Sequence, residues 1–529
     1  MVGADEIAVL IVGAGPTGLA MGCELARRGV SFRIVDKAEA YFHGSRGKGL
    51  QPRSLEVMDD LGVIERILEL GRFHLPFRGY AEGKVLGEQD MHAGHVPTPS
   101  TPYASTMLIP QWRVEETLRG LMERLGGQVE LGADLVGLEQ DNEGVTATLR
   151  RDGAEEIVRS RYLVASDGGR SFVRRHLGIP FEGETWKDER MYVADVTVTG
   201  LDREAWHAWP KHPDGFLTLC PLPSTDDYQL QAAIPVGSEE EPSLELFRRI
   251  VAERTEGMAV EITGCSWMSL FRANVRMVSR YREGRVFLAG DAAHVHTPAG
   301  GQGMNTGIQD AYNLGWKMAA VLGGAPEALL DTYEEERLPV AAAVLGVSSR
   351  LYKQIAAGGT DQLRRDGTTF QLGITYSAMS LSRAAGGSLK IAAGDRAPDA
   401  PGERMDGAAL RLFDLYRGPH WTLVRLFGSG SWAMDEVDGV NFVDVVAPVG
   451  VAGAASGIAE VFVDAGGHVA EAYGGNGEYM LVRPDGYVGW VGMAGDVGDL
   501  REYLARVMRK QSDIECFSQR QEQKRPTFH

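Results

Sequence analysis

Cysteine is scarce in this sequence, which has only four among 529 residues, at positions 23, 220, 265 and 516. Such wide spacing provides neither a CxxC pair nor any of the usual zinc-binding patterns. It gives no basis for a disulfide scaffold, and we expect no metal site. Isolated thiols are typical of a reducing compartment, so we expect a cytoplasmic protein.

Long apolar runs and long basic runs are also missing. No uncharged apolar stretch reaches the roughly eighteen residues that cross a membrane, and Asp5 and Glu6 stand where a signal peptide would carry basic residues. The chain has 54 basic and 72 acidic residues and a formal charge of −18, which argues against binding to nucleic-acid phosphates. We therefore expect neither a membrane nor a nucleic-acid partner. The length suits several domains.

A glycine-rich turn follows the first apolar strand, which is expected over residues 7–12. The turn, Gly13-Ala-Gly15-Pro16-Thr17-Gly18, leads into a helix, and Asp36 ends the next strand 18 residues after Gly18. In a dinucleotide-binding fingerprint, the first glycine permits the turn, the second lets the backbone approach a pyrophosphate, and the third lets helix and strand pack closely. An acid at this distance binds a ribose hydroxyl, so we expect FAD or NAD. A plain turn in an α/β unit is the alternative.

Two later stretches repeat the pattern of strand, acid, glycine and helix. The strand before Ser166 ends at Asp167 and Gly168, where capping of the next helix is the alternative role for the acid. In the second stretch, residues 285–310, an apolar strand runs into Gly290 and Asp291, then into a loop that ends where a helix is expected to open at Asn305. Free amides at a helix N-terminus suit a group that becomes anionic. A structural turn is the competing interpretation of this loop.

Residues 179–277 alternate between apolar and polar, which predicts an antiparallel sheet interrupted by one helix at 243–253. One apolar face could line a pocket for a flat aromatic ligand. The candidate pocket residues are Phe216, Leu219 and Trp267. Core packing is the alternative for Trp267, as it is for Trp186, Trp206 and Trp209.

Other polar positions have less specific interpretations. On the helix expected from residue 111, Gln111 and Arg113 are candidates for ligand contact, whereas capping and surface solubility account for the glutamates at 115 and 116. His294 and His296 could form a metal pair or an acid–base pair, and loop packing is the alternative for both. Pro339 predicts a helix boundary.

The domains are expected at 1–178, with 72–108 contributing to the substrate domain, then at 179–277, 278–393 and 394–509. A polar tail follows at 510–529. Turn-forming residues from Gly394 to Pro401 mark the clearest boundary.

Taken together, the motifs Gly13-x-Gly15-x-x-Gly18, Ser166-Asp-Gly168 and Gly290-Asp-Ala-Ala-His294, with the loop from Pro298 to Asn305, resemble those of the FAD-dependent aromatic hydroxylases built like p-hydroxybenzoate hydroxylase. The resemblance spans about residues 5–390. It implies an α/β fold, with a Rossmann-like FAD-binding domain and an inserted, mainly antiparallel β substrate domain. The last block resembles the thioredoxin-like domain of the phenol and polyketide hydroxylase branch, with Gly428-Ser-Gly-Ser-Trp432 where a CxxC pair would stand.

The resemblance also implies roles for single residues. Asp36, beside Lys37, should bind the adenosine ribose, Asp291 the ribityl chain, and Arg46 and Gln111 the flavin side. Asp167 and Gly168 are linked in the family to both FAD and the nicotinamide. The residues expected to border the flavin ring are Arg46, Pro298, Gly301, Gly303, Met304 and Asn305.

The family reduces FAD with NADPH or NADH, and a flavin C4a-hydroperoxide then transfers one oxygen atom from O2 to an aromatic ring. We expect this chemistry on a phenol or a polyketide-like aromatic, in a monomer or homodimer, for example in antibiotic biosynthesis. Baeyer–Villiger oxidation, epoxidation and oxidative dehydroxylation on the same fold are alternatives. A non-catalytic nucleotide-binding or assembly protein is another. The residues identify no base that would deprotonate a substrate.

Overall fold

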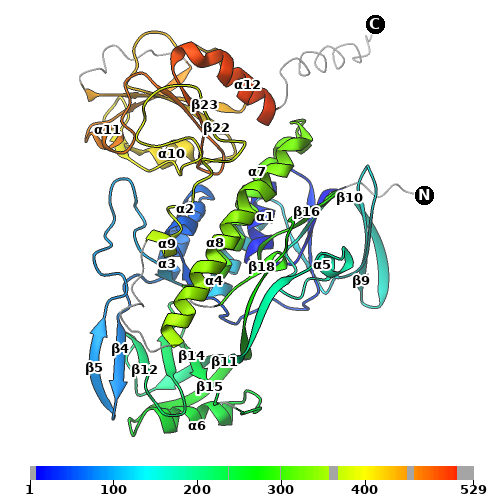
Figure 1. The fold of residues 1–529 in the computed structure, drawn as a ribbon, viewed down its shortest axis with the longest axis vertical. Helices are drawn as coiled ribbons and strands as arrows, with labels where there is room; N and C mark the ends of the chain where they lie inside the picture. The colour runs from blue at the N-terminus through cyan, green and yellow to red at the C-terminus, as the bar shows by residue number, and fades with distance from the viewer. Residues whose placement is uncertain (1–6, 236, 298–299, 357–366, 449–457, 509–529) are drawn as a thin grey trace. The chain divides into compact units, whose positions relative to one another are not determined.

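The structure is a computed structural model that describes residues 7–235, 237–297, 300–356, 367–448 and 458–508 (Figure 1). It divides into two compact units. The first contains residues 1–26, 31–311 and 338–373, and the second contains 27–30, 312–337 and 374–529. The second unit begins before the predicted boundary at 394, because β19 (Arg383–Ala384) pairs with β26 (Val488–Gly492) of the C-terminal sheet.

The first sheet of the first unit carries the nucleotide fingerprint, in the order β16-β17-β10-β1-β2-β7. Four neighbours in it are parallel: β17 (Val286–Leu288), β10 (Ala154–Ala165), β1 (Ile7–Val12) and β2 (Phe32–Asp36). Val12 lies opposite both Ala165 and Val35, and Ala165 lies opposite Leu288. The carboxyl ends of these strands therefore meet at one edge, and each of the three sequence motifs begins there.

Further elements complete this sheet and its helical cover. The remaining strands are β7 (Val129–Leu131), β8 (Asp134–Gln140), β9 (Val145–Arg151) and β16 (Arg282–Glu283). The helices are α1 (Pro16–Ala26), α2 (Pro52–Asp60), α3 (Ile64–Leu70), α4 (Gln111–Arg124) and α5 (Phe172–His176). A short two-stranded ladder joins β3 (Gly49–Leu50) to β6 (Met107–Leu108).

The second sheet of the same unit is the predicted antiparallel sheet, in the order β18-β15-β11-β14-β13-β12-β4-β5. Its strands are β11 (Glu182–Thr199), β12 (Trp206–Trp209), β13 (Leu217–Pro221), β14 (Asp227–Ala233), β15 (Glu261–Met277) and β18 (His294–Val295), with β4 (Phe77–Ala81) and β5 (Lys84–Gln89) from the 72–108 segment. The pairing is antiparallel except between β4 and β12. Two stretches far apart in the chain thus build one surface.

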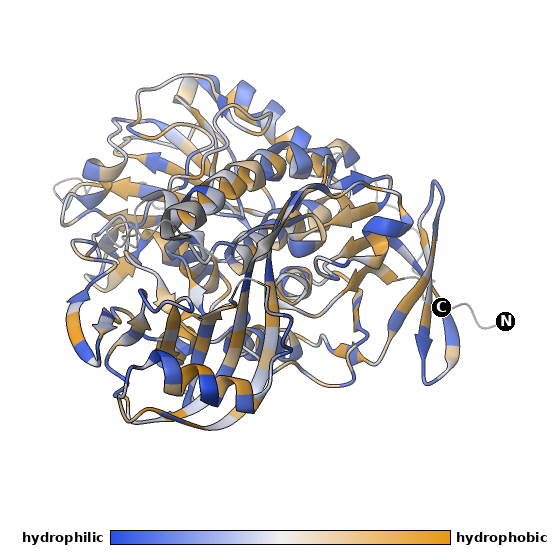
Figure 2. Cartoon of the chain, turned by 60° about the horizontal axis from the view of Figure 1, so that its bottom comes forward, coloured by the Kyte–Doolittle hydropathy of each residue, from blue (hydrophilic) through white to orange (hydrophobic). Residues whose placement is uncertain are grey.

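Helix α6 (Leu244–Arg254) covers one face of this second sheet. Its buried residues, including Phe247 and Ile250, pack on strand residues such as Tyr192, Leu219 and Leu230, while most of its other positions are charged (Figure 2). This face is a closed apolar core, and Trp209 belongs to it. A ligand on this sheet must therefore lie on the face opposite α6.

The C-terminal sheet of the second unit has the order β19-β26-β25-β22-β23-β24-β20-β21. Its central strands, β22 (Trp421–Leu426), β23 (Val440–Val446) and β24 (Ala459–Val463), are parallel, whereas β25 (Tyr479–Val482) and β26 are antiparallel. The outer strands and helices are β20 (Pro401–Glu403), β21 (Ala409–Arg411), α10 (Leu412–Tyr416), α11 (His468–Ala472) and α12 (Val497–Val507). This mixed α/β architecture agrees with the predicted fold class.

Two long helices contribute residues to both units, α7 (Gly303–Leu322) and α8 (Asp331–Ala356). The prediction of a helix boundary at Pro339 is wrong, because α8 continues through this residue. Proline removes one backbone hydrogen bond from a helix. The buried side chains on both sides of it, including Tyr333 and Ala341, hold the helix together despite that loss.

Four buried charged side chains lie together in the second unit. Arg483 donates to the two oxygens of Glu336 at 2.6 and 2.9 Å, and Lys317 donates to the same carboxylate at 2.6 Å. Asp485 accepts from Arg483 and, at 2.9 Å, from the ring nitrogen of Trp316. Burial lowers the pKa of Lys317 to about 8, although Glu336 opposes the shift. Two cations and two anions offset one another and fasten α7 and α8 to the end of β25.

We predict that Glu336→Gln destabilises the second unit by about 3–5 kcal/mol, because it leaves two buried cations with one anion. The exposed pair of Arg383 and Glu502, in the same unit, offers a matched control. Glu502→Gln should cost less than about 1 kcal/mol. Urea unfolding followed by tryptophan fluorescence measures both variants, and equal losses would contradict the account.

Candidate active site

The fingerprint turn uses its three glycines for different reasons. Gly13 has φ +102°, and a Cβ atom added to it would lie 2.3 Å from the carbonyl oxygen of Ser166. A Cβ on Gly18 would lie 1.9 Å from the Gly13 oxygen. At Gly15, by contrast, no atom lies within 4 Å of that position. Packing therefore requires Gly13 and Gly18, while Gly15 borders the open space that a pyrophosphate needs.

Asp36 ends β2 beside this turn, and the backbone holds its carboxylate. One oxygen accepts from the Ala14 amide and the other from the Ala38 amide, each at 2.8 Å. Each carboxylate oxygen can accept a further hydrogen bond, so ribose hydroxyls can still donate to it. Its neighbour Lys37 is exposed.

Asp167 follows β10 and does cap the next helix. One of its oxygens accepts from the amides of Phe172 and Val173, at 2.7 and 3.3 Å. Its second oxygen, Oδ1, is buried and has no hydrogen-bond partner within the described residues, and burial raises the pKa of the carboxyl. Gly168, at φ +80°, turns the chain directly after it. Capping thus uses half of the carboxylate and leaves the other half for a ligand.

Thr17 joins the first motif to the third. A Cβ on Gly290 would lie 2.5 Å from the Thr17 hydroxyl oxygen, and one on Gly307 would lie 2.3 Å from it. The start of α1, the turn at Gly290 and helix α7 can therefore meet only where two glycines face Thr17. Asp310 supports the same turn, since it accepts from the Gly290 amide at 3.1 Å and contacts His294 Nε2 at 2.7 Å.

Asp291 follows in the 3-10 turn Gly290–Ala292. The residue is exposed to solvent, yet the protein around it desolvates the carboxyl and raises its pKa. In the described part of the chain, no hydrogen bond or ion pair reaches this side chain. An accessible, partly desolvated and unpaired acid suits a polyhydroxy ligand.

The loop before α7 is held by amide side chains. Asn305 accepts from the Gln51 amide at 2.8 Å and donates to the carbonyls of Gly301 and Gly49. Gln51 in turn donates to Gly300 at 2.8 Å. The hydrogen bonds of the Asn305 side chain are thus made within the protein, so its backbone is the part of this residue available to a flavin ring. Pro298, which was predicted to border the ring, lies outside the described residues.

The loop of residues 42–48, hereafter the Arg46 loop, brings several predicted residues together. Gln111 accepts from the Gly47 amide at 3.1 Å, and Met304 approaches Gly47 from α7. The exposed Arg46 guanidinium lies over the Phe42 ring at 4.8 Å, and its charge acts on the carboxyl of Asp291. Arg113, the other candidate on α4, instead pairs with Glu116 and the Ser224 carbonyl.

Sequence reasoning missed Glu115, which was interpreted as a surface residue. It is buried and accepts from Gln111 at 2.8 Å, and burial raises the pKa of its carboxyl to about 7. The available signal was its spacing, because Gln111 and Glu115 are four residues apart and share one face of α4.

The second sheet presents Trp267 on the face opposite α6, where its ring meets Phe42 of the Arg46 loop edge-on, with 5.6 Å between centroids. Phe216 directly precedes β13, in which Leu217 and Leu219 face the core beneath α6, so an extended chain continued by one residue would place Phe216 with Thr218 on the opposite face. Leu219 points the other way, into the fully buried core beneath α6. We therefore leave Leu219 out of the pocket. The side chain of Trp186 lies outside the described residues.

His294 and His296 are stacked, with 6.2 Å between ring centroids and 9° between planes. Burial, and then the neighbouring His294, lower the pKa of His296 to about 4. His296 also packs against Gly303, where an added Cβ would lie 3.2 Å from the ring. These contacts support loop packing for both histidines. Within the described residues, no three histidine, cysteine or acidic side chains are grouped to hold a metal.

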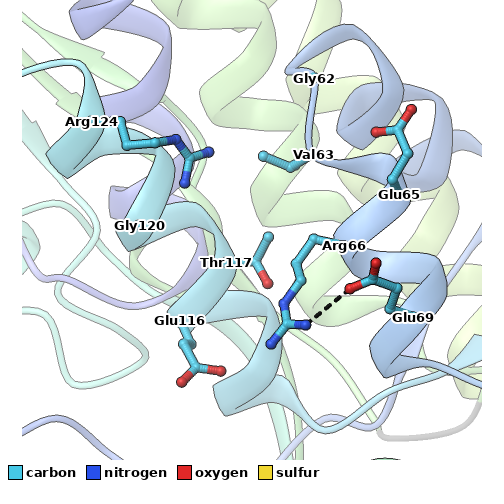
Figure 3. A pocket seen from close by; sticks show the side chains of 9 residues that line it. All are labelled: Gly62, Val63, Glu65, Arg66, Glu69, Glu116, Thr117, Gly120 and Arg124. Carbon is cyan, nitrogen blue, oxygen red and sulfur yellow. Dashed lines mark hydrogen bonds and ion pairs between the residues drawn. The ribbon is translucent and has the colours of Figure 1, made fainter.

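A surface groove of about 450 Å³ lies elsewhere, between α3 and α4 (Figure 3). Charged side chains line it, including Arg66 and Glu69, which pair at 3.0 Å. None of the predicted site residues lines this groove.

Two protein families match this chain, and together their matches cover most of its length. A family described as FAD binding domain matches residues 6–348, and one described as aromatic-ring hydroxylase, C-terminal, matches residues 390–510. The chain belongs to the FAD-dependent aromatic-ring hydroxylases. The resemblance and the FAD cofactor that it implies are thereby confirmed. Enzymes of this family are monooxygenases, and NAD(P)H is their typical reductant.

Individual relatives of this aromatic-ring hydroxylase span nearly the full chain. A flavin-dependent monooxygenase of Mycobacteroides abscessus is 42% identical over 514 residues, which cover 94% of this chain and 100% of that protein. Pentachlorophenol 4-monooxygenase of Sphingobium chlorophenolicum is 33% identical, covering 91% and 93%. The crystal structure of aklavinone-11 hydroxylase with FAD and aklavinone aligns with a TM-score of 0.80 at 28% identity, covering 96% and 99%. The hydroxylase has no helix, in the portion of it that is described, long and apolar enough to cross a membrane.

We predict that Gly15→Val weakens FAD binding at least roughly ten-fold, because the valine fills the space left for the pyrophosphate. Gly498, on α12, also has open space at its Cβ position. Gly498→Val should therefore keep the affinity of the parent protein. Fluorescence titration of the apoproteins with FAD measures both affinities. Normal FAD binding by the Gly15 variant would rule out the fingerprint assignment.

A second prediction concerns pH. In the folded protein Glu115 keeps its proton up to about pH 7, against 4.5 for its ordinary value. A raised pKa means that stability is lost as pH rises between these values, by about 3 kcal/mol. The Glu115→Gln apoprotein should therefore lose about 3 kcal/mol less than the parent between pH 4.5 and pH 8 in urea unfolding. Glu116→Gln, at the exposed neighbour, should show the same pH dependence of the free energy of unfolding as the parent. The same pH dependence in all three proteins would refute the raised pKa of Glu115.

Proposed function

We propose that this enzyme uses FAD, O2 and NADPH or NADH to hydroxylate a phenolic or polycyclic aromatic substrate. The observation that carries the proposal is the contact between Phe42 of the Arg46 loop and Trp267 of the second sheet. One loop thereby adjoins both the expected flavin site and an aromatic surface. Relatives named for pentachlorophenol and anhydrotetracycline, and a similar structure containing aklavinone, support the substrate class.

The chain's own residues fit FAD. Three features suit it: the open space at Gly15, the unpartnered buried oxygen of Asp167, and the accessible carboxylate of Asp291. In the proposed assignment the α1 amides and Gly15 hold the pyrophosphate, Asp36 the adenosine ribose and Asp291 the ribityl chain. The ring is bordered by Arg46, Gln111 and the backbone of Gly301, Gly303, Met304 and Asn305. FAD, when bound and reduced, supplies the activation of O2 and the delivery of one oxygen atom.

The protein itself contributes positive charge, held in fixed positions, beside the proposed flavin ring. Helix α7 begins at Gly303, so its N-terminal amides bring roughly half a positive charge to this end of the site. Arg46 adds a full positive charge. Both suit the negative charge that develops on a reduced ring. A single well-placed donor of this kind is worth about 2.7–4 kcal/mol to a rate.

The proposed substrate surface is the face of the second sheet opposite α6, with Trp267 and Phe216 as aromatic residues. Such residues bind a flat ring by burial and by edge or face packing. The Arg46 loop covers one end of this face. Substrate bound there would be enclosed between loop and sheet, which limits the escape of reactive oxygen species to water. The prediction of a monomer or homodimer is tested by analytical sedimentation of the holoenzyme.

We predict that Trp267→Ala raises the KM for the aromatic substrate about ten-fold, because it removes a ring and its buried area. NAD(P)H oxidation should also become uncoupled, with more hydrogen peroxide released per product, while FAD content stays normal. Trp432→Ala, in the C-terminal unit, removes an aromatic ring elsewhere and should leave both quantities unchanged.

The assay screens phenols and polycyclic aromatics while following NAD(P)H loss, peroxide release and product mass. Substrate-stimulated turnover with a hydroxylated product supports the proposal. An oxygenated product with altered carbon connectivity would favour Baeyer–Villiger oxidation. Turnover that no aromatic accelerates would count against both.

A further inference from the structure

The Arg46 loop is tied to the second sheet at the residue before Arg46. The Ser45 amide donates to Asp195 at 2.8 Å, and the Gln229 side chain donates to the Ser45 carbonyl. Asp195 and Gln229 lie opposite each other on β11 and β14, so they share one face of the sheet. Lys48 adds a bond from the loop to Gln229 at 2.6 Å.

The same loop is tied to α4 at the residue after Arg46. The Gly47 amide donates to the side chain of Gln111 at 3.1 Å, and the Gly47 carbonyl accepts from the Gln111 amide at 3.0 Å. Glu115 accepts from the other end of the Gln111 side chain and so orients it. All four backbone groups of the residues that flank Arg46 are thereby hydrogen-bonded.

The Arg46 side chain contrasts with this fixed backbone. It is exposed, it stacks only on Phe42, and within the described residues its guanidinium has no ion pair or hydrogen bond. Its charge nevertheless acts on the carboxyls of Asp291 and Glu115. A fixed backbone with an uncommitted cationic side chain is the arrangement expected of a preorganised ligand contact, since less conformational freedom is lost on binding.

We propose that Asp195, Gln229 and Glu115 are positioning residues that hold Arg46 at the FAD site from two sides, acting through the peptide groups next to it. The proposal rests on the proposed placement of Arg46 against FAD. It gives a role to two buried acids, Asp195 and Glu115, that no sequence motif indicated. Asp195 is buried in this sheet, and burial raises the pKa of its carboxyl to about 6.

A double-mutant cycle on FAD affinity tests the proposal. Asp195→Ala should weaken FAD binding about ten-fold, which is the usual effect of losing a hydrogen bond to a charged group. Arg46→Ala should weaken it by a similar factor. Because Asp195 acts through Arg46, the double variant should bind FAD no more weakly than Arg46→Ala alone. Asp195→Asn keeps an oxygen acceptor for the Ser45 amide and should stay within about two-fold of the parent.

Asp227 provides the matched control. It lies on β14 near Asp195 but accepts from Thr197 and Ser266, which are strand residues, and it does not touch the loop. Asp227→Ala should therefore leave FAD affinity unchanged, and circular dichroism checks that every variant is folded. If Asp195→Ala does not fold, Gln229→Met enters the same cycle, because it removes the bond to the Ser45 carbonyl with little change in volume.

The outcomes separate the two levels of the account. Losses that multiply in the double variant, or an Asp195→Ala protein that binds FAD normally, would overturn the positioning role and leave the placement of Arg46 intact. An unchanged affinity in Arg46→Ala alone would instead overturn the placement of Arg46 at FAD, and the positioning role with it. Matching losses in the single variants with no further loss in the double variant support the proposal.

Discussion

The parallel register of β1, β2, β10 and β17 is the constraint on which the rest of the site depends. It aligns the ends of four strands at one edge, so that the strand ends at Val12, Ala165 and Leu288 meet there although they are far apart in the chain. Close packing then restricts what can follow each strand. At Gly13, Gly18 and Gly290 an added Cβ atom would strike a neighbour, whereas Gly15 of the fingerprint turn faces open space. Asp167 and Asp291 follow strands that end at this edge, and within the described residues Asp167 Oδ1 and the Asp291 carboxylate have no hydrogen-bond partner.

The Arg46 loop connects this strand edge to the second sheet. Its peptide groups are bound by α4 on one side and by β11 and β14 on the other. Phe42 then meets Trp267 on the face that α6 leaves uncovered. A flavin-dependent oxygenase has to bring an aromatic ring close to its cofactor while excluding water, and one loop that adjoins both sites satisfies that requirement. The C-terminal unit has a different role, because its buried charges fasten α7 and α8 to its own sheet.

The sequence predicted the FAD cofactor and the strand, turn and helix around Gly13 because these signals are local: a strand, a turn and an acid at a set distance need no tertiary information. Burial of an acid is not local. The sequence alone predicts that Glu115 is exposed, and only the packing of α4 in the folded protein buries it. Asp195 lies on the polar face of a strand, and this face is covered only when the Arg46 loop folds over it. The error at Leu219 could have been avoided, since the predicted strand included both Phe216 and Leu219, and residues three apart in a strand point to opposite faces. The continuation of α8 through Pro339 could not be predicted from the sequence, because tertiary packing holds the helix together at this residue.

Amide hydrogen exchange of the full chain with and without FAD tests the central claim most directly, since it reports where the cofactor lies. The account predicts added protection in three separate segments: the fingerprint turn at Gly13–Gly18, the Arg46 loop, and the backbone from Gly300 to Asn305. It predicts no comparable change in the strands β22 and β23 of the C-terminal sheet. Protection confined to that sheet, or absent from the fingerprint turn, would contradict the account.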